Sequence, residues 1–247
     1  MKKIGVIGGL GPMATVYFLE CVTRMTKAKT DQEHPRIYMQ SCPDIPDRTA
    51  YILGESAENP LEDIVNMGLE LQRMGADFLA IPCITAHYFL EEMESRLEIP
   101  IVHLTEELAQ DIRQKEIQKV GILATTGTIQ SGVMRNELED AGIEVVVPDN
   151  EHQKFVMEII YDQIKSGESI NWSMVHKVIR HMLQGGAQKI ILGCTELPLL
   201  KKDVWAAENP ELERILYEDC IDVIEVLAQK AILYSGAKLK ENYIDII

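Results

Sequence analysis

Two segments that lie far apart in the chain share one pattern, and each ends in a cysteine. Residues 75–83 and residues 186–194 both begin with Gly-Ala, continue through an apolar run, and reach a cysteine eight residues after the glycine. A threonine follows each cysteine closely, at Thr85 and Thr195. This matched pair of segments indicates an internal duplication, and it predicts a protein built from two similar halves.

Strands and helices alternate along both halves of the chain. Strands are predicted over residues 3–7, 36–40, 78–81, 101–104, 119–124, 144–147 and 189–192. Helices are predicted over residues 12–27, 60–74, 131–141, 151–166, 171–184 and 211–235. Short apolar strands separated by helices are typical of parallel sheets that are covered on both faces. The predicted fold class is therefore α/β, with two similar parallel-sheet domains related by a pseudo-two-fold axis.

The domain boundaries follow from the same alternation. We predict a first α/β domain from residues 1–104 plus 211–247, because the last helix returns to it, and a second from residues 105–210. Ligands bind at the carboxyl ends of the strands in open parallel sheets. Cys83 and Cys194 both follow such strand ends, so we expect an active site in a cleft between the domains, with both thiols facing it.

The composition excludes several classes of partner. The 247 residues carry a formal net charge of −15, which argues against binding to nucleic acid or to an anionic membrane surface. No apolar run approaches the roughly 20 residues that span a bilayer, and the first residues do not resemble a signal peptide. The five cysteines form no CxxC pair, which argues against a disulfide framework and a cysteine-ligated zinc site. We expect a cytoplasmic protein.

Two opposed thiols are suited to racemisation at a Cα carbon. This reaction needs one group that removes a proton from one face and another that delivers a proton to the opposite face. A thiolate and a thiol meet this need, and they exchange roles with the hand of the substrate. The alternative is that Cys83 and Cys194 are buried structural residues. Cys21, Cys42 and Cys220 lack the symmetry and are predicted to be structural.

Six motifs, in order along nearly the whole chain, resemble those of the aspartate/glutamate racemase family. They include Pro-Cys-Ile-Thr-Ala-His at 82–87 and Gly-Cys-Thr-Glu at 193–196, and the others lie at residues 4–12, 45–49, 123–128 and 164–167. The resemblance implies an amino-acid racemase that needs no pyridoxal phosphate or other cofactor and that is usually a homodimer. The glutamate at position 196 resembles the aspartate racemase branch of the family, since glutamate racemases typically carry His at the equivalent position.

The resemblance also implies roles for individual residues. Cys83 and Cys194 would be the acid/base pair, and Arg48 and Lys165 would hold the distal carboxylate of a small amino-acid substrate. Hydroxyl or backbone donors to the α-carboxylate would come from Thr85, Thr126, Thr128 and Thr195. Met13 and Ile84 would also line the substrate pocket, and His87 and Glu196 would support the site. The alternative for Arg48 and Lys165 is a solvated surface charge.

The chain departs from the family pattern beside the first cysteine. The family usually has Asn where this chain has Ile84, and often Tyr near Met134. Isoleucine cannot form a side-chain hydrogen bond to the substrate, so the sequence predicts weakened activity on aspartate.

Three alternatives remain open at this point. The first is a related isomerase or racemase that acts on a different acid, which Ile84 favours. The second is a weakly active amino-acid-binding protein, against which the two cysteines argue. The third is a dinucleotide enzyme, suggested by the Gly-Leu-Gly-Pro-Met-Ala segment at residues 9–14, but Ser41-Cys42 stand where an acidic ribose ligand is needed.

Overall fold

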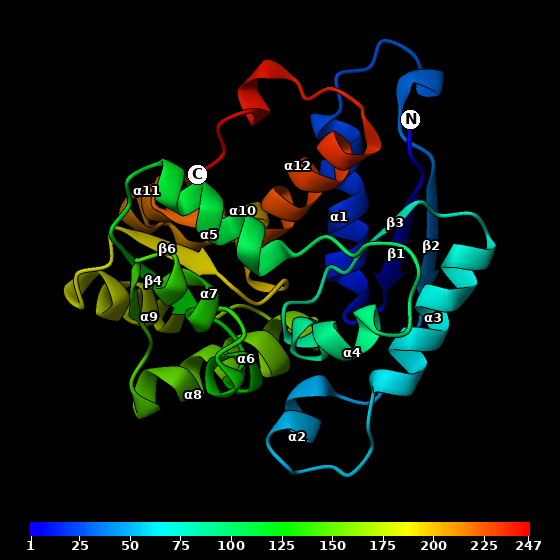
Figure 1. The fold of residues 1–247 in the computed structure, drawn as a ribbon. Coiled ribbons are helices and arrows are strands. Elements are labelled where there is room, and N and C mark those ends of the chain that lie inside the picture. Colours follow the sequence, from blue (N-terminus) through cyan, green and yellow to red (C-terminus); the bar gives the residue numbers. More distant parts are fainter. The chain divides into compact units, whose positions relative to one another are not determined.

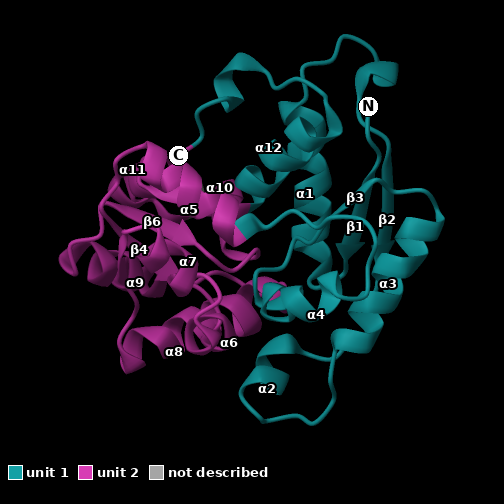
Figure 2. Ribbon diagram, in the orientation of Figure 1, with its two compact units in different colours: residues 1–104, 224–246 teal, residues 105–223, 247 magenta. Residues whose placement is uncertain are grey.

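The computed structural model describes the backbone of residues 1–247 and every side chain except those of residues 205 and 206. The chain forms two compact units, which Figure 2 shows in teal and magenta. The first unit contains residues 1–104 and 224–246, and the second contains residues 105–223 and 247. Among the helices of the described residues, none is both long enough and apolar enough to cross a membrane.

The first unit is built on a parallel sheet with the strand order β2-β1-β3 (Figure 1). Strand β1 (Ile4–Gly8) is fully buried between β2 (Ile37–Ser41) and β3 (Phe78–Ala80). The other elements are α1 (Pro12–Met25), η1 (Asp31–Glu33), α2 (Arg48–Ile52), α3 (Leu61–Arg73), the 3-10 helix η2 (Thr85–Phe89), α4 (Leu90–Glu94), α12 (Val223–Ser235) and η6 (Glu241–Tyr243).

The second unit is built on a four-stranded parallel sheet with the order β5-β4-β6-β7. Its strands are β4 (Lys119–Leu123), β5 (Glu144–Val146), β6 (Lys189–Leu192) and β7 (Cys220–Asp222). Its helices are α5 (Leu104–Gln114), α6 (Thr126–Ser131), α7 (Arg135–Asp140), α8 (Asn150–Glu158), the π-helix η3 (Ile159–Lys165), α9 (Trp172–Gln184), η4 (Leu197–Leu199), α10 (Leu200–Asp203), η5 (Val204–Ala207) and α11 (Pro210–Glu218). Side-chain caps start four of these helices, from Thr125, Asp149, Asn171 and Asn209.

The two sheets have the same topology, which confirms the predicted class of two similar parallel α/β units. In each unit the first strand is central and is flanked by the second and third strands. The third strand of each unit, β3 or β6, ends just before the cysteine of the repeated motif. An isolated parallel bridge from Leu79 to Ile101 takes the place in the first sheet that β7 takes in the second.

The repeated Gly-Ala pair has a structural explanation. Gly75 and Gly186 follow α3 and α9 with φ angles of 92° and 87°, a left-handed conformation that glycine adopts without strain. Each glycine therefore ends its helix and directs the chain into the third strand.

The alanines of these pairs pack against equivalent glycines in the central strands. A Cβ atom on Gly5 would lie 2.9 Å from Cβ of Ala76, and one on Gly121 would lie 3.3 Å from Cβ of Ala187. Small residues on both sides let the connection approach the central strand closely. The duplication thus extends from the sequence motif to the packing of the core.

Three predicted elements differ from the structure. The single helix predicted over 211–235 is wrong, because Cys220–Asp222 pair with β6 and divide the segment into α11, β7 and α12. Residues 211–223 consequently belong to the second unit, although we predicted them in the first. The helix predicted over 131–141 is divided at Gly132, whose φ is 72°, and the strand predicted over 101–104 is reduced to the bridge at Ile101.

Candidate active site

Cys83 lies in the loop between β3 and η2 of the first unit, and its side chain is buried. Nδ1 of His87 lies 3.0 Å from the carbonyl oxygen of Cys83, and it must donate because a carbonyl only accepts. Burial lowers the pKa of His87, so this imidazole is neutral at ordinary pH. His87 therefore supports the backbone at Cys83 and does not supply a positive charge beside it.

Cys194 lies between β6 and η4 of the second unit, and it is also buried. Its Sγ donates a hydrogen bond to Oε2 of Glu196 at 2.9 Å, and Oγ1 of Thr195 donates to the same oxygen at 3.4 Å. Burial raises the pKa of the Cys194 thiol well above its usual value, and the negative charge of Glu196 raises it further. The positive charge of Lys165 acts in the opposite direction on the pKa of Cys194. Cys194 is therefore protonated at rest.

Glu196→Gln should lower the pKa of the Cys194 thiol, because the substitution removes a buried negative charge and keeps the size of the side chain. The pKa is measured from the pH dependence of iodoacetamide alkylation at Cys194, in a Cys83→Ala background and with peptide mass spectrometry. Alkylation of the Glu196→Gln variant should begin at lower pH. An unchanged or raised midpoint would contradict the role assigned to Glu196.

The turns that follow the two cysteines are alike. Each begins as a 3-10 helix and continues as a short α-helix, η2 with α4 in the first unit and η4 with α10 in the second. A helix thus follows the third strand in both units, and its first turn has the tighter 3-10 form. Thr85 opens η2, and Thr195 lies two residues before η4; both side chains are buried.

Polar side chains also gather at the carboxyl end of β4, which is the neighbour of β6. Oγ1 of Thr125 caps α6 by accepting from the backbone N–H of Thr128 at 3.2 Å. Nε2 of Gln153 donates to the carbonyl of Ala124 at 3.0 Å and to Oγ1 of Thr126 at 3.3 Å. Within the second unit, the predicted residues Thr126 and Thr128 therefore lie at the same sheet edge as Cys194.

Gln153 contributes hydrogen bonds to this sheet edge, and the sequence analysis did not single it out. It lies on α8, and nothing in its sequence context distinguishes it from other polar helix residues. A cavity of about 610 Å³ adjoins these residues, lined by Thr126, Asn150, Gln153, Lys154, Met157, Glu158, Tyr161 and Asp162.

Arg48 is a buried charge and not a solvated one, since the residue is only 7% exposed. Its guanidinium donates to the carbonyls of Ile45 at 3.3 Å, Pro46 at 3.0 Å and Leu10 at 2.8 Å. These bonds tie the loop before α2 to the loop after β1. The surface-charge alternative is therefore wrong for Arg48.

The remaining predicted residues differ in their surroundings. Lys165 is exposed at the end of η3, with its Nζ 4.5 Å from the centre of the Tyr161 ring. Met13 is 57% exposed on the first turn of α1. Ile84 is 1% exposed, so its side chain is fully enclosed. Met134, also buried, lies against Gly193, where its Sδ would be 3.3 Å from an added Cβ atom.

The paired strand ends with their two cysteines agree with a known family of enzymes. A profile of the Asp/Glu/hydantoin racemase family matches residues 7–231. The chain belongs to this family. The family resemblance predicted from the motifs is thereby confirmed, and membership in a racemase family argues against the dinucleotide alternative.

Individual relatives agree with this assignment. The chain is 28% identical over 204 residues to the broad specificity amino-acid racemase RacX of Bacillus subtilis, covering 78% of this chain and 85% of the relative. The solved structure of Picrophilus torridus aspartate racemase is 30% identical, covers 98% of both chains and has a TM-score of 0.81. A putative Asp/Glu racemase from Yersinia pestis is 25% identical, with 96% of this chain and 100% of that chain covered and a TM-score of 0.77.

Proposed function

We propose that this racemase interconverts L- and D-aspartate, or a closely related acidic amino acid, without pyridoxal phosphate. The observation that carries the proposal is the equivalence of Cys83 and Cys194, which follow the third strand of two units with the same topology. The Picrophilus torridus relative, an aspartate racemase, supports the choice of substrate.

In the proposed reaction the two cysteines act on opposite faces of Cα. For one enantiomer the Cys83 thiolate removes the Cα proton, and the Cys194 thiol delivers its own proton to the other face. Cys83 is then a thiol and Cys194 a thiolate, which is the state that accepts the opposite enantiomer. The hydrogen bond from Cys194 to Glu196 supports this assignment, because it holds Cys194 as the proton donor at rest.

The carboxylates of the substrate need positive charge and hydrogen-bond donors. We assign the distal carboxylate to Arg48 and Lys165, and the α-carboxylate to hydroxyl or backbone donors of the four threonines Thr85, Thr126, Thr128 and Thr195. Donors at the α-carboxylate stabilise the negative charge that develops when the Cα proton leaves. The fixed guanidinium of Arg48 supports its part, since its three carbonyl bonds hold the positive charge in one place.

A second candidate function is racemisation of a less polar amino acid. The enclosed side chain of Ile84, next to Cys83, favours it, and so does the relative from Bacillus subtilis that is named for broad specificity. The two candidates are separated by incubating a panel of single-enantiomer amino acids with the protein and measuring both hands by chiral chromatography. The proposal expects turnover of aspartate, and turnover of apolar amino acids alone would overturn the substrate assignment.

Ile84→Asn should raise aspartate racemisation. If Ile84 leaves a polar group of the substrate without a partner, the cost is about 1–3 kcal/mol, equivalent to roughly 5- to 150-fold in rate or affinity. The gain should be in kcat for aspartate, measured by chiral chromatography, with Ile84→Val as the control that changes only size. Equal activity in all three proteins would mean that the side chain at position 84 plays no part in recognition.

The expected homodimer and the cytoplasmic location stay predictions. Light scattering during size-exclusion chromatography would test the first, with a mass of twice 27.9 kDa as the expected result.

A further inference from the structure

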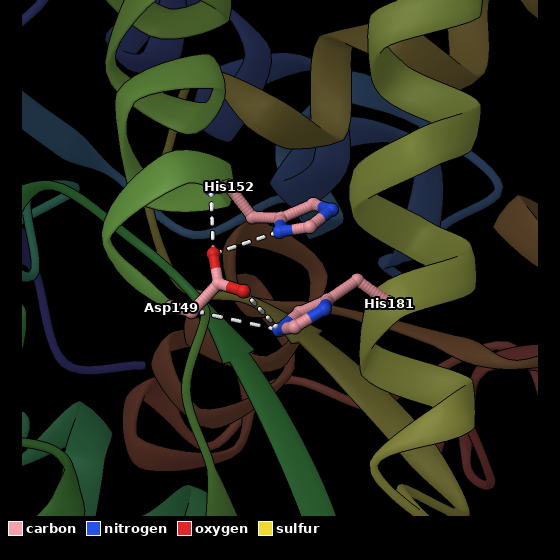
Figure 3. Close-up of side chains that lie close together, drawn as sticks. All are labelled: Asp149, His152 and His181. Carbon is pink, nitrogen blue, oxygen red and sulfur yellow. Dashed lines mark hydrogen bonds and ion pairs between the residues drawn. The ribbon is translucent and has the colours of Figure 1, made fainter.

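Three side chains away from the proposed active-site residues lie close together in the second unit (Figure 3). Asp149 directly precedes α8, His152 lies on the first turn of that helix, and His181 lies on α9, which packs against α8. Nδ1 of His152 is 2.8 Å from Oδ1 of Asp149, and Nε2 of His181 is 3.9 Å from Oδ2. One ligand atom of each residue lies within 4.8 Å of the other two.

The helix cap holds the carboxylate in place. Oδ1 of Asp149 accepts from the backbone N–H groups of Glu151 at 3.1 Å and His152 at 2.9 Å, so one oxygen starts α8. The other oxygen, Oδ2, is the one turned toward His181. A carboxylate that caps with one oxygen can therefore use the other as a ligand.

The two imidazoles are stacked, with centroids 3.9 Å apart and an angle of 14° between the rings. Figure 3 shows one nitrogen of each ring turned toward Asp149. Nε2 of His181 lies 3.4 Å from the backbone N–H of Asp149, which can only donate. This nitrogen is therefore unprotonated and accepts a hydrogen bond from that N–H, and a bound metal ion would take the place of this hydrogen bond.

We propose that Asp149, His152 and His181 form a binding site for a divalent transition-metal ion of the zinc class. Two imidazole nitrogens and one carboxylate oxygen are ligands that Zn²⁺ and its neighbours prefer, and three protein ligands leave a coordination position for water. The side chains of Asp149, His152 and His181 are 56%, 22% and 27% exposed, so an ion can reach them.

Binding of the ion requires a small movement of the rings. A metal ion lies in the plane of each imidazole that binds it, so the stacked rings must turn until their planes meet at the ion. Rotation about χ2 of histidine has a broad minimum, which allows this movement. The ion takes the place of the proton on Nδ1 of His152 and joins the start of α8 to α9.

The site would stabilise the part of the second unit that carries Thr126. Gln153, the neighbour of His152, donates to the carbonyl of Ala124 and to Thr126. A link between α8 and α9 therefore restrains the helix that holds this sheet edge.

The test is Co²⁺ binding to the full chain, followed by absorption spectroscopy and equilibrium dialysis. Because thiols also bind Co²⁺, the measurement uses a Cys83→Ala/Cys194→Ala variant next to the natural protein. We expect one equivalent of Co²⁺ with d–d bands of a nitrogen- and oxygen-ligated ion in both proteins. Loss of a residue that only hydrogen-bonds to a metal ligand weakens metal binding by roughly 10- to 100-fold. His152→Ala and His181→Ala remove ligands themselves, so each should weaken Co²⁺ binding by more than this.

Two further variants complete the test. Asp149→Asn keeps a capping side chain and removes the charge, and it should also weaken Co²⁺ binding. His176→Ala is the matched control, because His176 lies on the same helix α9 but has its Nε2 4.0 Å from Glu211, and binding should be unchanged. Circular dichroism checks that each variant is folded. Equal Co²⁺ affinity in the natural protein, His152→Ala and His181→Ala would overturn the proposal, as would loss of the bound Co²⁺ on removal of the two thiols.

Discussion

Replacing either Cys83 or Cys194 with alanine is expected to abolish racemisation, while exchange of the Cα hydrogen with solvent survives from one enantiomer only. Each variant keeps a single thiol, which can remove a proton from one face but finds no proton donor on the other. General acid–base catalysis contributes about 10²- to 10⁴-fold in rate, so the loss should be at least that large. The two variants should favour exchange of opposite hands of the substrate.

Cys220→Ala is the matched control for these two variants. Cys220 is a buried cysteine in β7 of the second unit, and burial raises the pKa of its thiol to about 12, so it stays protonated and inert. Racemisation should be unchanged apart from any loss of folded protein, which a urea unfolding curve would detect. Near-normal racemisation in Cys83→Ala or Cys194→Ala would rule out the two-base mechanism.

Arg48→Ala is expected to weaken the use of acidic amino acids much more than that of neutral ones. Loss of a hydrogen bond to a charged group costs roughly 1.5–3 kcal/mol, which corresponds to about 10- to 150-fold in kcat/KM for aspartate. Neutral amino acids have no distal carboxylate, so their kcat/KM should change little. Steady-state kinetics with both classes of substrate provide the comparison.

The buried bonds of Arg48 make a second measurement necessary. Because its guanidinium holds the carbonyls of Leu10, Ile45 and Pro46, the alanine variant should also be less stable in urea. Arg24→Ala, which removes an exposed partner of Glu225, controls for the loss of one positive charge. Equal losses for acidic and neutral substrates would assign Arg48 a purely structural role.

The duplicated motif explains how much of the fold could be predicted from the sequence. The Gly-Ala pairs at 75 and 186 mark a helix end and a close contact with the central strand in both units, so they carry enough local information to reveal the matching topology. Strand β7 was missed because three residues between two helical patterns give no signal of their own. Their strand conformation comes from pairing with β6, a contact distant in sequence.

In the candidate site, too, local sequence pattern predicted some features, and contacts between distant residues determined the others. The positions of Cys83 and Cys194 at strand ends followed from local pattern, whereas the partners of their side chains did not. The bond from Cys194 to Glu196 depends on how the turn after β6 directs the chain, and the burial of Arg48 depends on the loop after β1. The grouping of Asp149 with His181 joins residues 32 positions apart on two helices, which no sequence motif indicates.

The central claim is that one enzyme moves protons on both faces of Cα through two thiols. The most direct measurement is incubation of L-aspartate, and separately D-aspartate, with the natural protein in D₂O, followed by chiral chromatography and mass spectrometry of each hand at early times. The account predicts that the enantiomer formed carries one deuterium at Cα, while the remaining starting enantiomer is still largely undeuterated, because each thiol serves one face. Early deuteration of the starting enantiomer at the same rate as inversion would contradict it, since a single exchanging base would then serve both faces.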